Sequence, residues 1–204
     1  MSRTLWLPLL LLLVAPAVAQ EVKDLDQLLA DVHEHGYMPV PPEHGRFLQL
    51  ITELRGAKRV LEVGTSNGYS GLWIGRGLLR TGGKLDTIEI DKERAAAARE
   101  NFKKAGFDDV ITLYQGDAFQ VIPKLAGDFD MIFLDTGNWK AFFDAAYPKL
   151  RPGGVLLAHN ALRDRSEQEK LIDAIKDNPQ LLTSVVQIGS DGFLIVYKRH
   201  PEKK

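Results

Sequence analysis

Three acidic residues at the ends of short apolar segments are the first candidates for chemistry in this 204-residue chain. Glu89, Asp117 and Asp135 each close or follow a run typical of a buried strand. Carboxylates in such places accept hydrogen bonds from sugar hydroxyls or hold a cation. Because the carboxyl ends of parallel strands meet at one edge of a sheet, we expect these side chains to share a ligand site.

A glycine-containing loop follows another apolar segment and adds a second signal. Gly64 and Gly68 permit a tight turn and close approach of a ligand to the backbone. The fingerprint of dinucleotide-binding proteins would need glycine at position 66, which is serine. We expect Glu62 to face the ligand, where its carboxylate would repel a pyrophosphate and attract an ammonium or sulfonium. The loop therefore favours a zwitterionic, cationic ligand over a nicotinamide dinucleotide.

Alternating strand-like and helix-like segments must position these residues. The apolar spacing predicts strands over residues 59–63, 84–90, 110–114, 131–134, 155–158, 182–188 and 193–197. It predicts helices over 22–34, 70–79, 91–105, 117–125, 139–150 and 166–175. A further helix, opened by Pro41 and Pro42, is expected to carry the apolar residues Phe47, Leu48, Ile51 and Leu54. Such alternation predicts an α/β fold with a mainly parallel sheet covered on both faces. The last two strands lack an intervening helix, so we expect an antiparallel hairpin at one sheet edge.

Composition excludes several classes of protein. The chain has a formal net charge of −1 and no cysteine. Near-neutral charge argues against a dedicated nucleic-acid binder. The lack of cysteine removes disulfides, thiolate nucleophiles and iron–sulfur clusters.

The N-terminus predicts a leader over residues 1–19. Arg3 supplies one positive charge, residues 5–14 are apolar, and a small-x-small site ends at Ala19. This pattern predicts a signal peptide and export to the periplasm or medium. The alternative is an N-terminal anchor, and only then would we expect membrane association. The remainder, 20–204, is expected to form a single domain.

These motifs together resemble a known family. Residues 60–70, 88–91 and 116–118 resemble class I S-adenosylmethionine-dependent methyltransferases, and more narrowly the small O-methyltransferases of the catechol and caffeoyl-CoA type. The resemblance extends from Tyr37 to Lys198. It implies a Rossmann-like, doubly wound sheet of seven strands with the last strand inserted antiparallel, which agrees with the expected hairpin.

The resemblance implies a binding site for S-adenosylmethionine. Glu62 and Ser70 would hold its methionine part, Glu89 its ribose, and Asp117 with Ala118 its adenine. The full implied set is Met38, Val40, Glu62, Gly64, Thr65, Gly68, Tyr69, Ser70, Glu89, Gly116, Asp117, Ala118 and Asp135.

The resemblance also implies a reacting centre built on Asp135, Lys140 and His159. The family's metal ligands would correspond to Asp135, His159 and Asn160, with histidine where the family has aspartate. Imidazole shifts the preference of such a site from magnesium toward transition metals. Three interpretations of His159 stay open: a ligand of a divalent metal, a metal-free general base, or a hydrogen-bonded residue with no chemical role.

Other positions depart from the family pattern or carry weaker signals. Lys140 follows Asp135 by two residues more than in the family, so either it reaches inward or it lies on the surface. Leu194 replaces an acidic residue that contacts the acceptor in catechol enzymes. The aromatic residues Trp139, Phe142 and Phe143 either line an acceptor pocket or belong to the core. His33 and His35 could bind a metal by residue type, but two histidines two positions apart on a helix do not share a face. We therefore interpret these two and His44 as solvated.

The sequence therefore predicts an O-methyltransferase that uses S-adenosylmethionine on a small, hydroxylated, aromatic acceptor. The alternative is an exported binding protein of the same fold without catalysis. No nucleic-acid partner is expected, and a homodimer stays open.

Overall fold

The computed structural model describes residues 14–163, 165–189 and 191–201. Its helices are α1 (Val14–Glu34), α2 (Pro42–Leu54), α3 (Tyr69–Thr81), α4 (Lys92–Lys104), α5 (Ala118–Val121), α6 (Trp139–Ala146) and α7 (Arg165–Ile175), with 3₁₀ turns η1 (Ile122–Lys124) and η2 (Tyr147–Lys149). Its strands are β1 (Arg59–Val63), β2 (Lys84–Glu89), β3 (Ile111–Gln115), β4 (Phe129–Leu134), β5 (Leu150–His159), β6 (Leu181–Ile188) and β7 (Asp191–Lys198).

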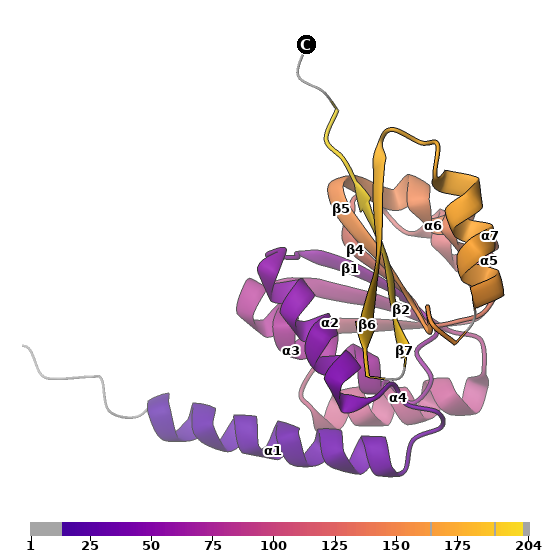
Figure 1. Cartoon of the computed structure of the whole chain (residues 1–204). Helices are drawn as coiled ribbons and strands as arrows, with labels where there is room; N and C mark the ends of the chain where they lie inside the picture. Colours follow the sequence, from indigo (N-terminus) through magenta and orange to yellow (C-terminus); the bar gives the residue numbers. More distant parts are fainter. Residues whose placement is uncertain (1–13, 164, 190, 202–204) are drawn as a thin grey trace, which may run out of the picture.

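The strands form one seven-stranded sheet in the order β3-β2-β1-β4-β5-β7-β6 (Figure 1). Strands β1 to β5 pair in parallel, whereas β7 is antiparallel to both β5 and β6. The predicted fold is therefore confirmed, including the closing hairpin and the insertion of the last strand beside β5. The reversal of strand order between β1 and β4 creates the crevice in which such sheets bind ligands.

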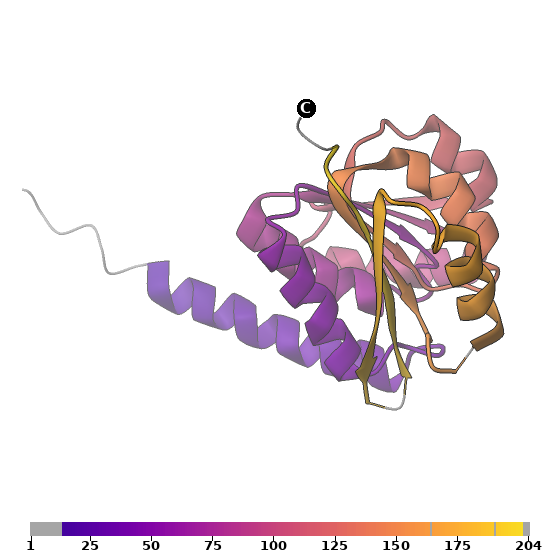
Figure 2. The same cartoon turned by 45° about the horizontal axis from the view of Figure 1, so that its top comes forward.

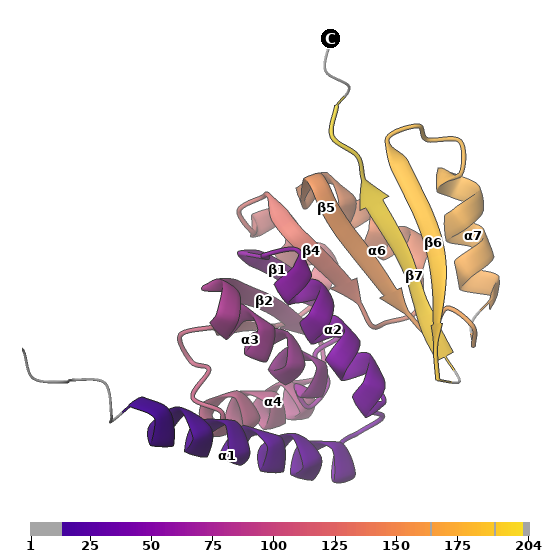
Figure 3. The same ribbon diagram turned by 60° about the vertical axis from the view of Figure 1, so that its left-hand side comes forward.

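Helices cover both faces of the sheet (Figures 2 and 3). Buried residues of α1, α2, α3 and α4 pack on one face, and those of α5, α6 and α7 on the other. Along β4, Met131 and Phe133 belong to the first core, whereas Ile132 and Leu134 belong to the second. Because side chains alternate between the faces of a strand, a strand buried on both faces must be almost wholly apolar.

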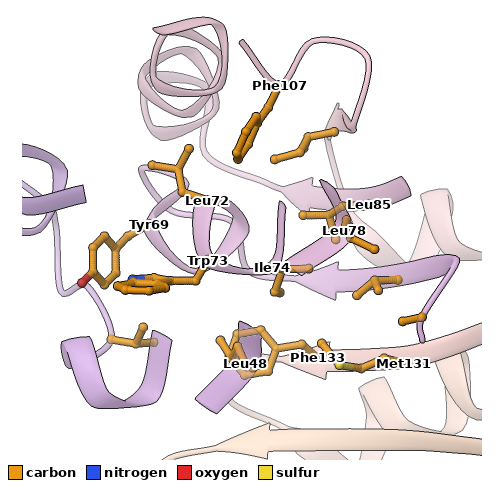
Figure 4. Packing of buried hydrophobic residues seen from close by; sticks show 14 of the residues in the cluster. Leu48, Tyr69, Leu72, Trp73, Ile74, Leu78, Leu85, Phe107, Met131 and Phe133 are labelled. Carbon is orange, nitrogen blue, oxygen red and sulfur yellow. The ribbon is translucent and has the colours of Figure 1, made fainter. Parts of the chain in front are cut away.

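Small residues bring two helices close together on the first face. A side chain at Gly45 of α2 would lie 2.2 Å from the indole of Trp73 on α3. Figure 4 shows Trp73 beside Tyr69, with Leu48 of α2 facing Phe133 of the sheet. This contact fixes the position of α2, which carries a histidine into the interior.

Several boundaries differ from the sequence-based expectations. The helix expected over 117–125 is a short α5 followed by η1, and the helix expected over 139–150 is α6 followed by η2. Pro123 and Pro148 sit in the two 3₁₀ turns, and proline ends a regular α-helix because it lacks an N–H.

The predicted leader falls mostly outside the described part of the chain. Residues 1–13 are not described, and 14–19 form the first turns of α1. Among the described residues, the longest apolar stretches in helices fall short of a membrane span.

Candidate functional site

A pocket of about 830 Å³ lies at the carboxyl ends of the parallel strands, at the reversal of strand order. Seven residues of the expected cofactor set line it: Met38, Gly64, Glu89, Gly116, Asp117, Ala118 and Asp135. His159 and Asn160 line the same pocket at the end of β5. The fold thus brings residues spread over more than a hundred positions into one cavity.

Glu89 is held rigidly at the end of β2. One carboxylate oxygen accepts a hydrogen bond from the backbone N–H of Ser66 at 2.7 Å, and the other from that of Asp91 at 2.9 Å. The residue is 5% exposed, and it lines the pocket. Each carboxylate oxygen can accept a second bond, so Glu89 is oriented and still able to receive two hydroxyl groups.

The glycine loop is shaped by the protein's own backbone. Gly64 has a φ of 97°, and a side chain there would lie 2.4 Å from the carbonyl oxygen of Asp135. Glycine is the one residue that combines this conformation with this contact. Gly64 therefore lets β1 and β4 end side by side, which places Asp135 at the pocket.

Glu62 does not face the pocket, contrary to the expectation from sequence. It shares the face of Val60, which α3 covers, because alternate residues of a strand point to the same side. Its two oxygens accept hydrogen bonds from the hydroxyls of Ser70 and Thr87, each at 2.6 Å. Burial is the main cause that raises the pKa of Glu62 to about 7, with nearby Asp135 and Glu89 adding to it.

Five further residues of the implied cofactor set lie outside the pocket wall: Val40, Thr65, Gly68, Tyr69 and Ser70. Tyr69 packs against His33, and burial raises the pKa of its phenol. Gly68 precedes α3 as its N-cap, with a φ of 90°. These residues support the glycine loop and the start of α3 without lining the pocket.

Two of the acidic residues also cap helices. Asp91 accepts hydrogen bonds from the backbone N–H groups of Glu93 and Arg94, and Asp117 accepts one from Phe119. Side-chain oxygens at such positions satisfy N–H groups that the first turn leaves unpaired. Asp117 lines the pocket as well, whereas Asp91 is exposed and structural.

A chain of hydrogen bonds runs from the pocket into the core through two histidines. Nδ1 of His159 lies 2.9 Å from Oδ1 of Asp135, and its Nε2 lies 2.7 Å from Nδ1 of His44. Nε2 of His44 in turn lies 2.7 Å from the carbonyl oxygen of Ile188. His159 shares the face of Leu157, which α2 covers, and this explains how it meets His44.

The interpretation of His44 as solvated was wrong, because its side chain is completely buried. The sequence did hold a signal: His44 precedes Leu48 by four positions and so shares the buried face of α2. His35 is exposed, as expected, and hydrogen-bonds a carbonyl of its own helix. His33 is half-buried against Tyr69.

The donor set around Asp135 does not fit a metal ion in this arrangement. A histidine ligand needs a ring nitrogen with a free lone pair, yet both nitrogens of His159 have protein partners. Within the described residues, no group of three histidine or acidic side chains has the geometry of a metal site.

Lys140 lies at the start of α6 and pairs with Asp144, 2.5 Å away on the same helix. Both side chains are on the surface, so the ammonium group does not point into the pocket. Leu194 is completely buried in the core on the α6 and α7 side. Trp139 and Phe142 line the pocket, whereas Phe143 packs in that same core and stacks on Tyr147.

Sequence reasoning missed three charged residues of the pocket wall: Asp191, Arg163 and Arg94. Asp191 begins β7 and is 4% exposed, and Arg163 Nε lies 3.5 Å from its Oδ1. The sequence placed Asp191 in a turn, where an acidic residue is unremarkable. Arg94 also lines the pocket and covers the ring of Tyr37 at 3.9 Å.

Comparison with known proteins gives a consistent result. Residues 17–198 match a family model described as O-methyltransferase. A catechol O-methyltransferase of Niastella koreensis is 40% identical over 131 residues, which cover 61% of this chain and 59% of that protein. A catechol O-methyltransferase of Mycobacterium tuberculosis is 30% identical over 188 residues, which cover 83% of this chain and 85% of that protein.

A solved structure shows the same likeness in three dimensions. The O-methyltransferase from Bacillus cereus, crystallised with S-adenosylhomocysteine, superposes with a TM-score of 0.78 at 28% identity. The match covers 90% of this chain and 97% of that one.

Proposed function

The chain belongs to the O-methyltransferase family, and from this premise we propose that it transfers the methyl group of S-adenosylmethionine to a hydroxyl of a small aromatic acceptor. One observation carries the proposal. A single pocket joins the oriented carboxylate of Glu89 and the segment 116–118 to Asp135, with aromatic side chains beside it. A cofactor and an acceptor need such neighbouring subsites for direct transfer.

The residues around Glu89 fit the nucleoside part of S-adenosylmethionine. Glu89 can accept hydrogen bonds from two ribose hydroxyls, because its own contacts leave one lone pair on each oxygen. The strand end at 116–118 offers a polar edge and exposed backbone for adenine. When bound, the sulfonium supplies a methyl group that is open to displacement.

Asp135 fits the role of proton acceptor for the transfer. Its Oδ1 is bonded to His159, while among the described residues no donor contacts its Oδ2. An acceptor hydroxyl that donates to Oδ2 would lose its proton there as its oxygen attacks the methyl carbon. The O–CH₃ bond forms while the S–CH₃ bond breaks, which yields a methyl ether and S-adenosylhomocysteine. The carboxylate becomes a carboxylic acid and later releases its proton to water.

The wall beside Asp135 supports an aromatic acceptor. Trp139 and Phe142 line this part of the pocket, and Phe142 stacks on Phe119 at 4.6 Å between ring centroids. Flat aromatic walls bind flat rings through dispersion and the hydrophobic effect. Relatives named catechol O-methyltransferase support the same substrate class. In this chain Leu194 cannot bind an acceptor hydroxyl, so we do not restrict the acceptor to catechol.

The test is methyl transfer from labelled S-adenosylmethionine to a panel of phenols, catechols and hydroxycinnamates. We expect product with at least one aromatic member and none with aliphatic alcohols. In Asp135→Asn we expect a rate at least about a hundredfold lower, because a general base is lost. Asp144→Asn, which changes an exposed aspartate of α6, is the matched control. Cofactor binding without transfer to any acceptor would instead favour a binding protein of this fold.

We also propose that residues 1–19 direct export, with cleavage near Ala19, and that 20–204 form the functional domain. The charge, apolar run and small-residue site of the N-terminus support this proposal. Intact mass measurement of the protein from a bacterial periplasm would test it. A mature chain beginning near Gln20 is expected, and an intact N-terminus would favour an anchor.

A further inference from the structure

The two buried histidines form a network that the transfer step described above does not use. Three close contacts connect the carbonyl of Ile188, the rings of His44 and His159, and the carboxylate of Asp135. The distances are 2.7, 2.7 and 2.9 Å, which are those of good hydrogen bonds. His44 and His159 are 0% and 5% exposed.

The partners of the two rings account for every ring nitrogen of His159. Its Nδ1 faces the carboxylate of Asp135, and its Nε2 faces Nδ1 of His44. The ring of His44 is held in turn by the carbonyl oxygen of Ile188. A nitrogen engaged in a hydrogen bond has no lone pair free for a metal ion, so His159 in this arrangement offers none.

The surroundings keep this network closed to water. The ring of Phe193 is fully buried and lies 5.2 Å from the ring of His44 and 5.3 Å from that of His159. An apolar wall of this kind excludes water, so the buried polar groups of the two rings need their protein partners. Among the described residues, Asp135 is the acidic group that contacts His159.

We propose that the hydrogen bonds of His159 to Asp135 and to His44 take the place of a metal site, so that methyl transfer in this protein needs no divalent metal. His44 is then a positioning residue: it holds the ring of His159 with Nδ1 toward Asp135 and occupies Nε2. A metal could bind His159 only after one of these hydrogen bonds had broken. The inference rests on the proposed methyl transfer for its role in catalysis, but metal binding can be measured separately.

Calorimetric titration of the full chain with Mn²⁺ tests the proposal without any assay of activity. We expect no stoichiometric binding by the wild type, and the same result for Asp135→Asn, His159→Gln and the exposed control His35→Gln. Stoichiometric binding of Mn²⁺ by the wild type that Asp135→Asn abolishes would overturn the proposal.

Chelation tests the consequence for catalysis. After treatment with a chelator, we expect the rate of methyl transfer to stay within about twofold of that with added Mg²⁺ or Mn²⁺. Activity that disappears on chelation and returns with metal would refute the proposal and leave the proposed function standing. No binding of Mn²⁺ together with no product from any acceptor would refute the proposed function and leave the metal-free arrangement of His159 standing.

Variants of His44 test its positioning role. His44→Leu should lower kcat at least about tenfold while KM for S-adenosylmethionine stays within about twofold, because orientation of Asp135 matters in the transition state. His44→Gln should recover part of kcat, because a carboxamide can accept from His159 and donate to Ile188. Equal losses of kcat in both variants, or a parallel loss of cofactor affinity, would refute the role. If His44→Leu does not fold, His44→Gln and the calorimetry still decide.

Discussion

His44 and His159 are separated by 115 positions in the chain, yet their ring nitrogens lie 2.7 Å apart in the interior. The contact joins α2, which precedes the sheet, to the end of β5. It places a hydrogen-bonded pair directly behind the carboxylate that lines the pocket. The site is therefore supported from the core side by a helix that does not itself follow a strand.

Replacement of Glu89 by glutamine should weaken cofactor binding. The variant loses a charged acceptor and turns an amide N–H₂ toward one of the backbone N–H groups of Ser66 and Asp91. We expect the Kd for S-adenosylmethionine to rise at least about tenfold, the value of one charge-assisted hydrogen bond. Calorimetry measures it. Exposed Glu93→Gln on α4 should bind as the wild type does, and equal affinities for all three proteins would contradict the assignment.

Glu62 should make the protein less stable as pH rises. Its pKa is about 7 in the folded state and 4.5 in the reference state, so the folded protein binds more protons between these values. Stability is highest below pH 4.5 on this account and falls through pH 7, by about 3 kcal/mol in total. Urea unfolding of wild type and Glu62→Gln at pH 5 and pH 8 measures the difference. The variant should have the flatter profile, and parallel profiles would be inconsistent with a buried acid.

Lys140 should be dispensable. Its ammonium group pairs with Asp144 on the surface, and exposed pairs contribute little. We expect Lys140→Ala to keep kcat/KM within about threefold of the wild type, because the loss of an exposed ion pair has only a small energetic effect. Lys176→Ala, which removes an exposed lysine paired with Asp173, is the control. A fall in kcat/KM of about a hundredfold or more, the size expected when a general acid or base is lost, would instead place Lys140 at the reacting centre.

Gly45 should be essential for the packing of α2 on α3. An added methyl group would lie 2.2 Å from the indole of Trp73, so the helices must separate. We expect Gly45→Ala to lower the free energy of unfolding by about 2 kcal/mol, as overpacking does. At Gly127 the nearest atom would be 3.9 Å away, and Gly127→Ala serves as the control. Denaturant titration of both variants checks this, and equal stabilities would argue against a tight α2–α3 contact.

The sequence alone determined three features of this protein: the order of its strands and helices, the class of its sheet, and the edge of the sheet that carries the site. These features follow from local patterns: apolar runs, the glycines at 64 and 68, and the capping aspartates at 91 and 117. Interactions between residues a few positions apart can be predicted from the sequence, because both partners lie within one short segment.

The side to which each polar residue turns was decided only by the tertiary structure. Glu62 adjoins the glycine loop in sequence, but strand alternation sends its side chain under α3. Lys140 follows Asp135 closely, yet α6 directs it to the surface. His44 is paired with His159 because α2 crosses the sheet face on which β5 ends, and no local pattern encodes so distant a contact. The physical reason is that packing between distant elements, rather than neighbouring residues, selects the partners of a buried polar group.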